Sequence, residues 1–152
     1  KGRWVIVSIH WGMEYHPGAD DRQHRLAKRL AEGGASLVVG HHPHVLQEIE
    51  WIQAEGQTSP TLVAYSLGNA LFDQPMPDTR RSVVLFVSLN SYGIQNWWVL
   101  PFEIDHPQTR CQSMKSFLLE IICRRLCGES ECILQDPNTM DQLPILIELS
   151  RQ

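Results

Sequence analysis

Apolar and polar positions in the first forty residues follow two different periods. Residues 4–10 (WVIVSIH) form a nearly continuous apolar run, typical of a strand that is covered on both faces of a sheet. Residues 21–32 instead carry apolar side chains at helical spacing, with Asp20 placed to cap the helix and two glycines after it. Residues 37–39 are again apolar and β-branched. The pattern predicts a βαβ unit with two parallel strands.

The remainder of the chain is predicted to contain mainly antiparallel strands and a C-terminal helix. Residues 45–52 fit either a strand or a short helix, and residues 61–66 fit a strand. Two further strands, 82–89 and 97–104, flank a turn-forming stretch and should pair as an antiparallel hairpin. Apolar residues at helical spacing predict a helix over 113–127. The fold class expected from these elements is α/β.

Three histidines follow the second strand of the predicted βαβ unit. The sequence SLVVGHHPHVLQ places His41, His42 and His44 directly after Gly40. Neutral imidazole is a good ligand of first-row transition metals. Pro43 has a fixed φ and is expected to push His42 toward extended geometry, which would stiffen the turn. The pattern indicates a metal-binding turn, and the alternative is a solvent-exposed polar loop.

A fourth histidine, His10, ends the first strand of the same unit. Parallel strands end at one edge of a sheet, and ligands collect outside their carboxyl ends. We therefore expect His10 to lie near His42 and His44. Three imidazoles without a carboxylate would form a neutral site that holds one zinc-like ion and leaves a coordination position open.

The composition is that of a globular protein. The 152 residues are 43% hydrophobic and 20% charged, which suits one domain with a core of its own. A formal net charge of -4 argues against nucleic acid as a partner and against a polybasic membrane patch. The most apolar stretch, 117–126, is short and interrupted by charges, so the chain is expected to be soluble. Because it opens without methionine on an apparent interior strand, we expect it to be part of a larger protein.

The cysteines and most tryptophans are expected to contribute to packing. The cysteines lack the C-x-x-C spacing of a structural zinc site. They are Cys111, Cys123, Cys127 and Cys132. They are either buried thiols or, in an oxidising compartment, include a Cys127–Cys132 disulfide. Trp51, Trp97 and Trp98 are expected to pack against the sheets rather than to form a sugar-stacking platform, with adjacent Trp97 and Trp98 on opposite faces.

Several motifs in combination resemble the CapA family of capsule or poly-γ-glutamate biosynthesis proteins. They are HWGMEY at residues 10–15, GHHPHVLQ at 40–47, YSLGN at 65–69 and FDQ at 72–74. The resemblance covers residues 3–105 and implies the calcineurin-like metallophosphoesterase fold.

By this resemblance the chain is the C-terminal half of a metallophosphoesterase-like α/β/β/α sandwich. Residues 1–105 would form a family domain whose N-terminal portion is missing, and residues 106–152 a helical, partly irregular extension.

The resemblance also implies a metal site. It assigns His10, His42 and His44 as ligands of a divalent metal (Mn, Zn or Fe), with a dinuclear centre only in a complete protein. The first half of the family fold normally supplies an aspartate–histidine pair, a bridging aspartate and a GNH motif. None of these is found here, which we expect because the N-terminal portion is missing, and Gly68-Asn69 is not the GNH motif because Ala70 follows it. The chain alone is therefore expected to be inactive.

Five further residues are expected near this site as metal-site supports or substrate contacts. They are His41, Glu14, Tyr15, Asn69 and Asp73. The alternatives are a solvated Glu14, a packed Tyr15 and an Asn69 that only stabilises a turn.

Three functions follow from the resemblance and the missing motifs. The first is a contribution of histidine ligands to a metallophosphoesterase-type site in a CapA-like protein of cell-envelope polymer synthesis. Its partners would be the missing N-terminal half and other polymer-synthesis proteins at the bacterial membrane. The second is metal-dependent phosphoesterase activity when the two halves are joined. The third is an inactive truncated remnant.

Overall fold

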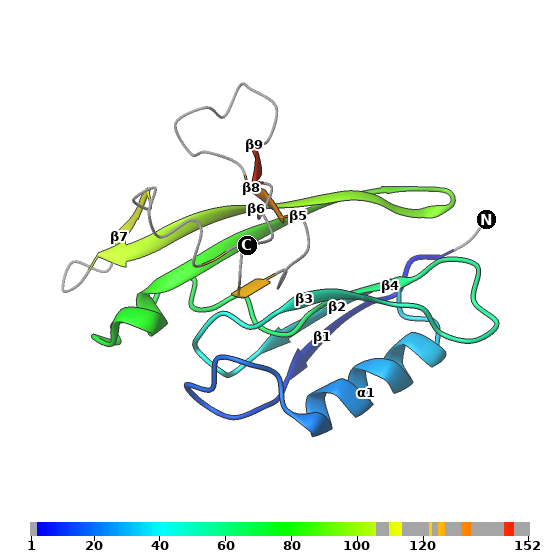
Figure 1. Ribbon diagram of the computed structural model, residues 1–152, viewed down its shortest axis with the longest axis horizontal. Coiled ribbons are helices and arrows are strands. Elements are labelled where there is room, and N and C mark those ends of the chain that lie inside the picture. Colours follow the sequence, from blue (N-terminus) through cyan, green and yellow to red (C-terminus); the bar gives the residue numbers. More distant parts are fainter. Residues whose placement is uncertain are drawn as a thin grey trace, which may run out of the picture.

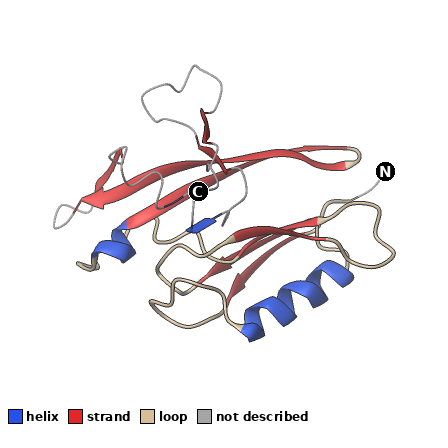
Figure 2. Ribbon diagram, viewed as in Figure 1, coloured by secondary structure: helices blue, strands red, loops and turns tan. Residues whose placement is uncertain are grey.

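Two β-sheets lie face to face in the computed structural model of the chain, and one helix covers the outer face of the first sheet (Figure 1). The structure describes residues 3–105, 110–113, 122, 125–126, 132–134 and 145–147. The first sheet has the order β1-β2-β4-β3 and comprises β1 (Ile6–His10), β2 (Leu37–His41), β3 (Ile49–Ile52) and β4 (Thr61–Ala64). The second comprises β5 (Arg81–Asn90), β6 (Gly93–Asp105), β7 (Arg110–Ser113), β8 (Cys132–Leu134) and β9 (Ile145–Ile147). The helices are α1 (Asp21–Glu32) and the short 3-10 helix η1 (Pro77–Arg80), drawn in blue in Figure 2.

The predicted βαβ unit is confirmed. β1 and β2 pair in parallel, with His10 opposite His41 at their carboxyl ends. Asp20 caps α1 and forms a capping box with Gln23, which satisfies two backbone N–H groups at the start of the helix. Fully buried Ala27 is on the face of α1 that packs against the first sheet. No helix in the described part of the chain has the length and apolarity needed to cross a membrane.

The later strands confirm the α/β class and its mainly antiparallel second part. β3 pairs antiparallel with β4, so the ambiguous segment 45–52 contains a strand rather than a helix. β5 and β6 form the expected antiparallel hairpin. The core between the two sheets includes fully buried Leu46 and Leu62 on one side and Val99 on the other.

The helix expected over 113–127 lies largely outside the described residues. Ile122, Arg125 and Leu126 are described and are helical, and Ile122 and Leu126 are buried in the core between the sheets. The cysteine side chains also fall outside the side chains that the structure describes. β8 and β9 join the second sheet through β6, while the domain boundary at residue 105 stays a prediction.

Two expectations about coverage were wrong. β1 is an edge strand whose Ile6 is 58% exposed, so it is not covered on both faces within the described structure. Trp51 lies on the other edge strand, β3, and is 42% exposed rather than packed. The hydrophobicity of a segment does not by itself show whether its strand lies in the middle or at an edge of the sheet. Trp97 and Trp98 do face opposite sides, because Trp97 packs against the core and Trp98 stacks on Phe86 with ring centres 5.5 Å apart.

Gly40 allows the backbone and an indole ring to pass unusually close to β2. The Trp11 indole N–H donates to the Tyr65 carbonyl oxygen at 2.9 Å, and a Cβ atom at Gly40 would collide with both of these groups. Position 40 needs glycine for space, because its neighbours are the backbone directly after β4 and a buried indole ring, and neither can move away.

We therefore expect Gly40→Ala to lower the free energy of unfolding by about 3 kcal/mol or more. Urea denaturation followed by circular dichroism measures this. The matched control is Gly18→Ala, because no heavy atom lies within 4 Å of the Cβ it would add. Equal stability of the two variants would contradict the close approach at Gly40.

Candidate metal centre

The carboxyl ends of β1 and β2 carry the predicted histidines to one edge of the first sheet. The backbone N–H of Trp11 donates to the His41 carbonyl oxygen at 3.1 Å, which continues the pairing of β1 with β2 just beyond the end of β1. The Tyr15 N–H then donates to the Pro43 carbonyl oxygen at 2.8 Å. These bonds hold the loop after β1 beside the histidine turn after β2.

Glu14, His42 and His44 form a group of potential metal ligands at this edge. One ligand atom from each residue lies within 4.8 Å of the other two. The His10 ring lies beside them, with its centre 4.5 Å from the centre of the His42 ring. Glu14 and His10 are exposed, whereas His42 and His44 are half-buried. The three predicted histidines thus lie together, and a carboxylate joins them.

The turn has an unusual backbone. His42 has φ 103°, His44 has φ 60° and Tyr15 has φ 63°. The expected extended geometry of His42 was wrong, because Pro43 disfavours the helical region without by itself selecting the extended one. Positive φ at non-glycine residues costs about 1–3 kcal/mol each and persists where the surroundings enforce it. Here these residues include two of the three that converge on the candidate centre.

Asn69 fixes the orientation of His44. Its side-chain amide N–H groups donate to the Thr79 carbonyl oxygen at 2.9 Å and to Gln74 Oε1 at 3.2 Å. Its Oδ1 lies 2.8 Å from His44 Nδ1 and can act only as an acceptor. His44 Nδ1–H is therefore the donor, which leaves the lone pair of Nε2 for a metal.

Two aromatic rings flank His44. The Tyr15 ring centre is 6.1 Å away and the Phe72 ring centre 5.1 Å away. The Tyr15 hydroxyl accepts a hydrogen bond from Gln74 Nε2 at 3.0 Å. Gln74 also accepts from Asn69, so the Tyr15 ring is connected to Asn69 through Gln74. The sequence reasoning did not name Phe72 or Gln74 as site residues, although both lie in the FDQ motif after YSLGN.

A buried pair of glutamines holds the loop between β1 and α1. Gln47, which is fully buried, donates to the carbonyl oxygens of His16 at 2.9 Å and Gly18 at 3.0 Å. Gln23 Nε2 donates to Gln47 Oε1 at 2.9 Å, and Gln23 also belongs to the capping box of α1. The loop that carries Glu14 is therefore attached to the helix through buried hydrogen bonds. Sequence reasoning missed this role of Gln47, the last residue of GHHPHVLQ.

His10, which was predicted as a ligand, lies beside the group without belonging to it, and two of the predicted supporting residues are not brought to it. His41 is exposed, and its Nε2 lies 2.7 Å from the Ser8 hydroxyl on the neighbouring strand. Asp73 is exposed and makes no hydrogen bond or ion pair with the residues that the structure describes.

Tyr65 supports the candidate metal centre through Trp11 without contributing a ligand. It is fully buried, and its hydroxyl donates to Glu50 Oε1 at 2.7 Å. Burial raises the pKa of the Tyr65 phenol, and the hydrogen bond to the Glu50 carboxylate raises it further. Tyr65 therefore stays neutral, and its carbonyl oxygen holds the Trp11 indole that follows His10.

The donor set fits one divalent transition-metal ion. Imidazole nitrogens and a carboxylate oxygen bind zinc at about 2.0–2.2 Å, so two ligand atoms on one ion are at most about 4.4 Å apart. The separations of up to 4.8 Å between the ligand atoms of Glu14, His42 and His44 require only a small movement to reach this geometry. Three protein ligands would leave a coordination position for water or substrate.

Comparison with known proteins is consistent with the motifs. The family described as "Bacterial capsule synthesis protein PGA_cap" matches residues 1–74. The chain is 36% identical to "PGA biosynthesis protein CapA" of Bacillus subtilis (strain 168) over 126 residues, which are 83% of this chain and 32% of that protein. It is 39% identical to "Capsule biosynthesis protein CapA" of Bacillus anthracis over 101 residues, which are 66% of this chain and 23% of that protein.

The chain thus spans about a third or less of the length of these curated relatives. The matched family region includes Glu14, the histidine turn and Asn69. On these grounds the chain belongs to the CapA family of bacterial capsule synthesis proteins.

Proposed function

We propose that this chain supplies Glu14, His42 and His44 as ligands of one divalent metal ion, with His10 beside them, in a CapA protein of capsule or poly-γ-glutamate biosynthesis. The observation that carries the proposal is the convergence of the three ligand atoms within 4.8 Å of one another. The bond from His44 to Asn69 supports it, since a ligating histidine commonly has its other ring nitrogen fixed in this way.

The participation of Glu14 changes the charge of the proposed site. Three imidazoles alone would be neutral, whereas an ionised Glu14 offsets one charge of a divalent ion. A mixed nitrogen and oxygen donor set suits Zn, Mn or Fe. When bound, such an ion would polarise a phosphoryl oxygen and activate a bound water. The residues of this chain would orient the ion, and the Tyr15 and Phe72 rings would shield one side of it.

A second part of the proposal concerns the partner of this chain. In the part of the chain that the structure describes, β1 is an edge strand, and its Ile6, Ser8 and His10 side chains are exposed on one face. We infer that the N-terminal half of the family fold lies along this edge and supplies the further ligands of a dinuclear centre. Residence at the bacterial cell envelope beside other polymer-synthesis proteins belongs to the same proposal and rests on the names of the relatives.

Phosphoesterase activity is the second candidate function. It is favoured by an exposed carboxylate and histidines at the ends of parallel strands, a placement where substrate can reach a bound ion. It also requires the aspartate–histidine pair and the bridging aspartate that the first half of the family fold supplies, so it is assigned only to the joined halves.

Calorimetric titration with zinc and manganese should detect one binding site per chain. Replacing both histidines of the turn (His42→Ala with His44→Ala) should abolish binding, because two of three ligands are lost. The control is His24→Ala, which removes a histidine on α1 whose side chain is 45% exposed. Unchanged binding in the double variant would refute the assignment of the turn.

The role of Asn69 gives a second test of the same site. Asn69→Ala should weaken metal binding by about 10- to 100-fold, because His44 loses the acceptor that fixes its tautomer and ring orientation. Asn69→Asp keeps an acceptor oxygen for His44 but cannot donate to the Thr79 carbonyl oxygen or to Gln74, so it should restore only part of the affinity. Gln95→Ala is the matched control, since among the described residues the Gln95 side chain makes a single hydrogen bond, a 3.4 Å contact with the Gly93 carbonyl oxygen. Equal affinities of the alanine and aspartate variants would contradict a positioning role.

Hydrolysis of p-nitrophenyl phosphate with manganese separates the candidate functions. We expect no turnover by this chain alone and turnover when it is joined to the N-terminal half of the fold. A joined protein that binds metal without turnover would favour a role in assembly. A joined protein that binds no metal would leave the inactive remnant as the explanation.

A further inference from the structure

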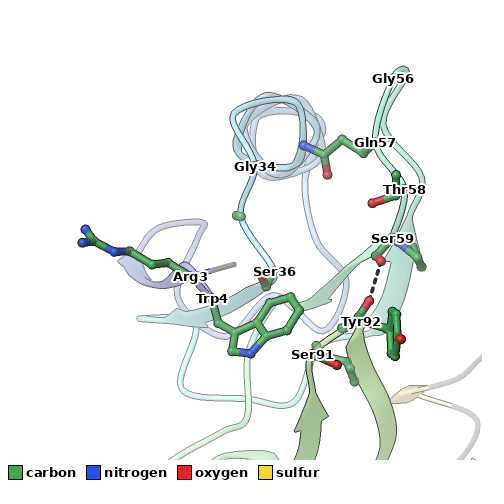
Figure 3. A pocket seen from close by; sticks show the side chains of 14 residues that line it. Arg3, Trp4, Gly34, Ser36, Gly56, Gln57, Thr58, Ser59, Ser91 and Tyr92 are labelled. Carbon is green, nitrogen blue, oxygen red and sulfur yellow. Dashed lines mark hydrogen bonds between the residues drawn. The ribbon is translucent and has the colours of Figure 1, made fainter. Parts of the chain in front are cut away.

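A pocket of about 580 Å³ lies at the opposite end of the first sheet from the candidate metal centre (Figure 3). It is lined by residues that precede the parallel strands, among them Trp4 before β1, Ser36 before β2 and Ser59 before β4. The tip of the β5–β6 hairpin, with Ser91 and Tyr92, closes the other side. This volume is within the range of about 300–1,000 Å³ that is usual for small-molecule sites.

The hairpin tip is attached to the first sheet, so both walls of the pocket have fixed positions. The Ser59 hydroxyl donates to the Tyr92 carbonyl oxygen at 2.7 Å, the bond that is dashed in Figure 3. Gly93 has φ 136°, and Ser59 Oγ lies 3.3 Å from where a Cβ atom of residue 93 would be. Gln57 Nε2 donates to the Ala31 carbonyl oxygen near the end of α1, which anchors the loop before β4.

Several polar groups in this lining are unused. The hydroxyls of Thr58 and Ser91 and the indole N–H of Trp4 make no hydrogen bond with the described residues. Within the described residues only the Nε2 of the Gln57 side chain is engaged, so its oxygen is available as an acceptor. The pocket therefore offers both donors and acceptors to a ligand.

Two aromatic side chains stand at the pocket with large exposed areas. Trp4 is 37% exposed and Tyr92 is 80% exposed. In Figure 3 the Trp4 indole extends toward the side of Ser91 and Tyr92, whereas the Arg3 side chain extends the other way. Exposed aromatic rings beside unpaired hydroxyl and amide groups suit a ligand with apolar C–H faces and a periphery of hydroxyls.

We propose that this pocket binds a neutral saccharide unit through Trp4 and Tyr92. The C–H face of a pyranose ring would stack on the aromatic rings, and its hydroxyls would exchange hydrogen bonds with Thr58, Ser91 and Gln57. Among the residues that the structure describes, the lining contains one cation, Arg3, and no carboxylate. A polyanionic chain would need several cations to compensate its charge, so a neutral sugar fits this lining better than an acidic polymer does. The proposal does not depend on the metal centre.

The test uses four soluble probes and the whole chain. They are maltotetraose and chitotetraose as neutral sugars, trigalacturonate as an acidic sugar and a γ-linked glutamate hexamer as an acidic peptide. Binding is followed by tryptophan fluorescence and by amide chemical shifts in NMR spectra. We expect saturable binding of at least one neutral tetrasaccharide, with shifts at Thr58, Ser91 and Tyr92.

Trp4→Ala should raise the Kd of that tetrasaccharide by about tenfold or more, and Trp4→Phe should raise it less, because a ring remains for stacking. Trp51→Ala is the matched control, since Trp51 has a similar exposure of 42% and lies on the far edge strand β3. Melting temperatures identify any variant that fails to fold, and zinc titration of Trp4→Ala should match the unaltered chain. The zinc result keeps the outcome for this pocket separate from that for the metal centre.

Three results would overturn the proposal. They are no saturable binding of either neutral sugar, an unchanged Kd for Trp4→Ala and Trp4→Phe when both are folded, and Trp4-dependent binding of only the acidic probes. The last result would assign the pocket to an acidic polymer.

Discussion

The parallel pairing of β1 with β2 is the interaction on which the rest of this structure depends. It sets His10 opposite His41 and brings the loops after both strands to the same edge. Hydrogen bonds from Trp11 and Tyr15 to the histidine turn continue the pairing past the strands. Backbone hydrogen bonds fix this register. A register shift of one residue would turn every side chain of β1 to the other face of the sheet. The candidate metal centre is therefore a consequence of the sheet.

The edge that carries the histidines combines a strained turn with a network that keeps it in place. Positive φ at His42 and His44 is unfavourable for each residue by itself. The turn is surrounded by the bond from His44 to Asn69, by the rings of Tyr15 and Phe72 beside His44, and by the hydrogen bonds of buried Gln47. A site fixed in this way loses little entropy when an ion binds, which is the advantage of preorganisation.

The two ends of the first sheet have different chemistry for a topological reason. Residues that precede parallel strands gather at one end, and residues that follow them gather at the other. Here the carboxyl ends carry imidazoles and Glu14, while the amino ends carry aromatic and hydroxyl side chains. β1 and β2, each five residues long, separate the two ends, so ligands can be bound at both ends at the same time.

The sequence by itself determined the βαβ unit, the antiparallel hairpin and the placement of His10, His42 and His44, because hydrophobic periodicity and the handedness of βαβ connections are local properties. The tertiary structure decided that Glu14 rather than His41 or Asp73 joins the histidines, and that Asn69 orients His44. It also decided that Trp4 and Tyr92 line one pocket. These relations join residues far apart in the chain through side-chain direction and packing, which no local pattern specifies.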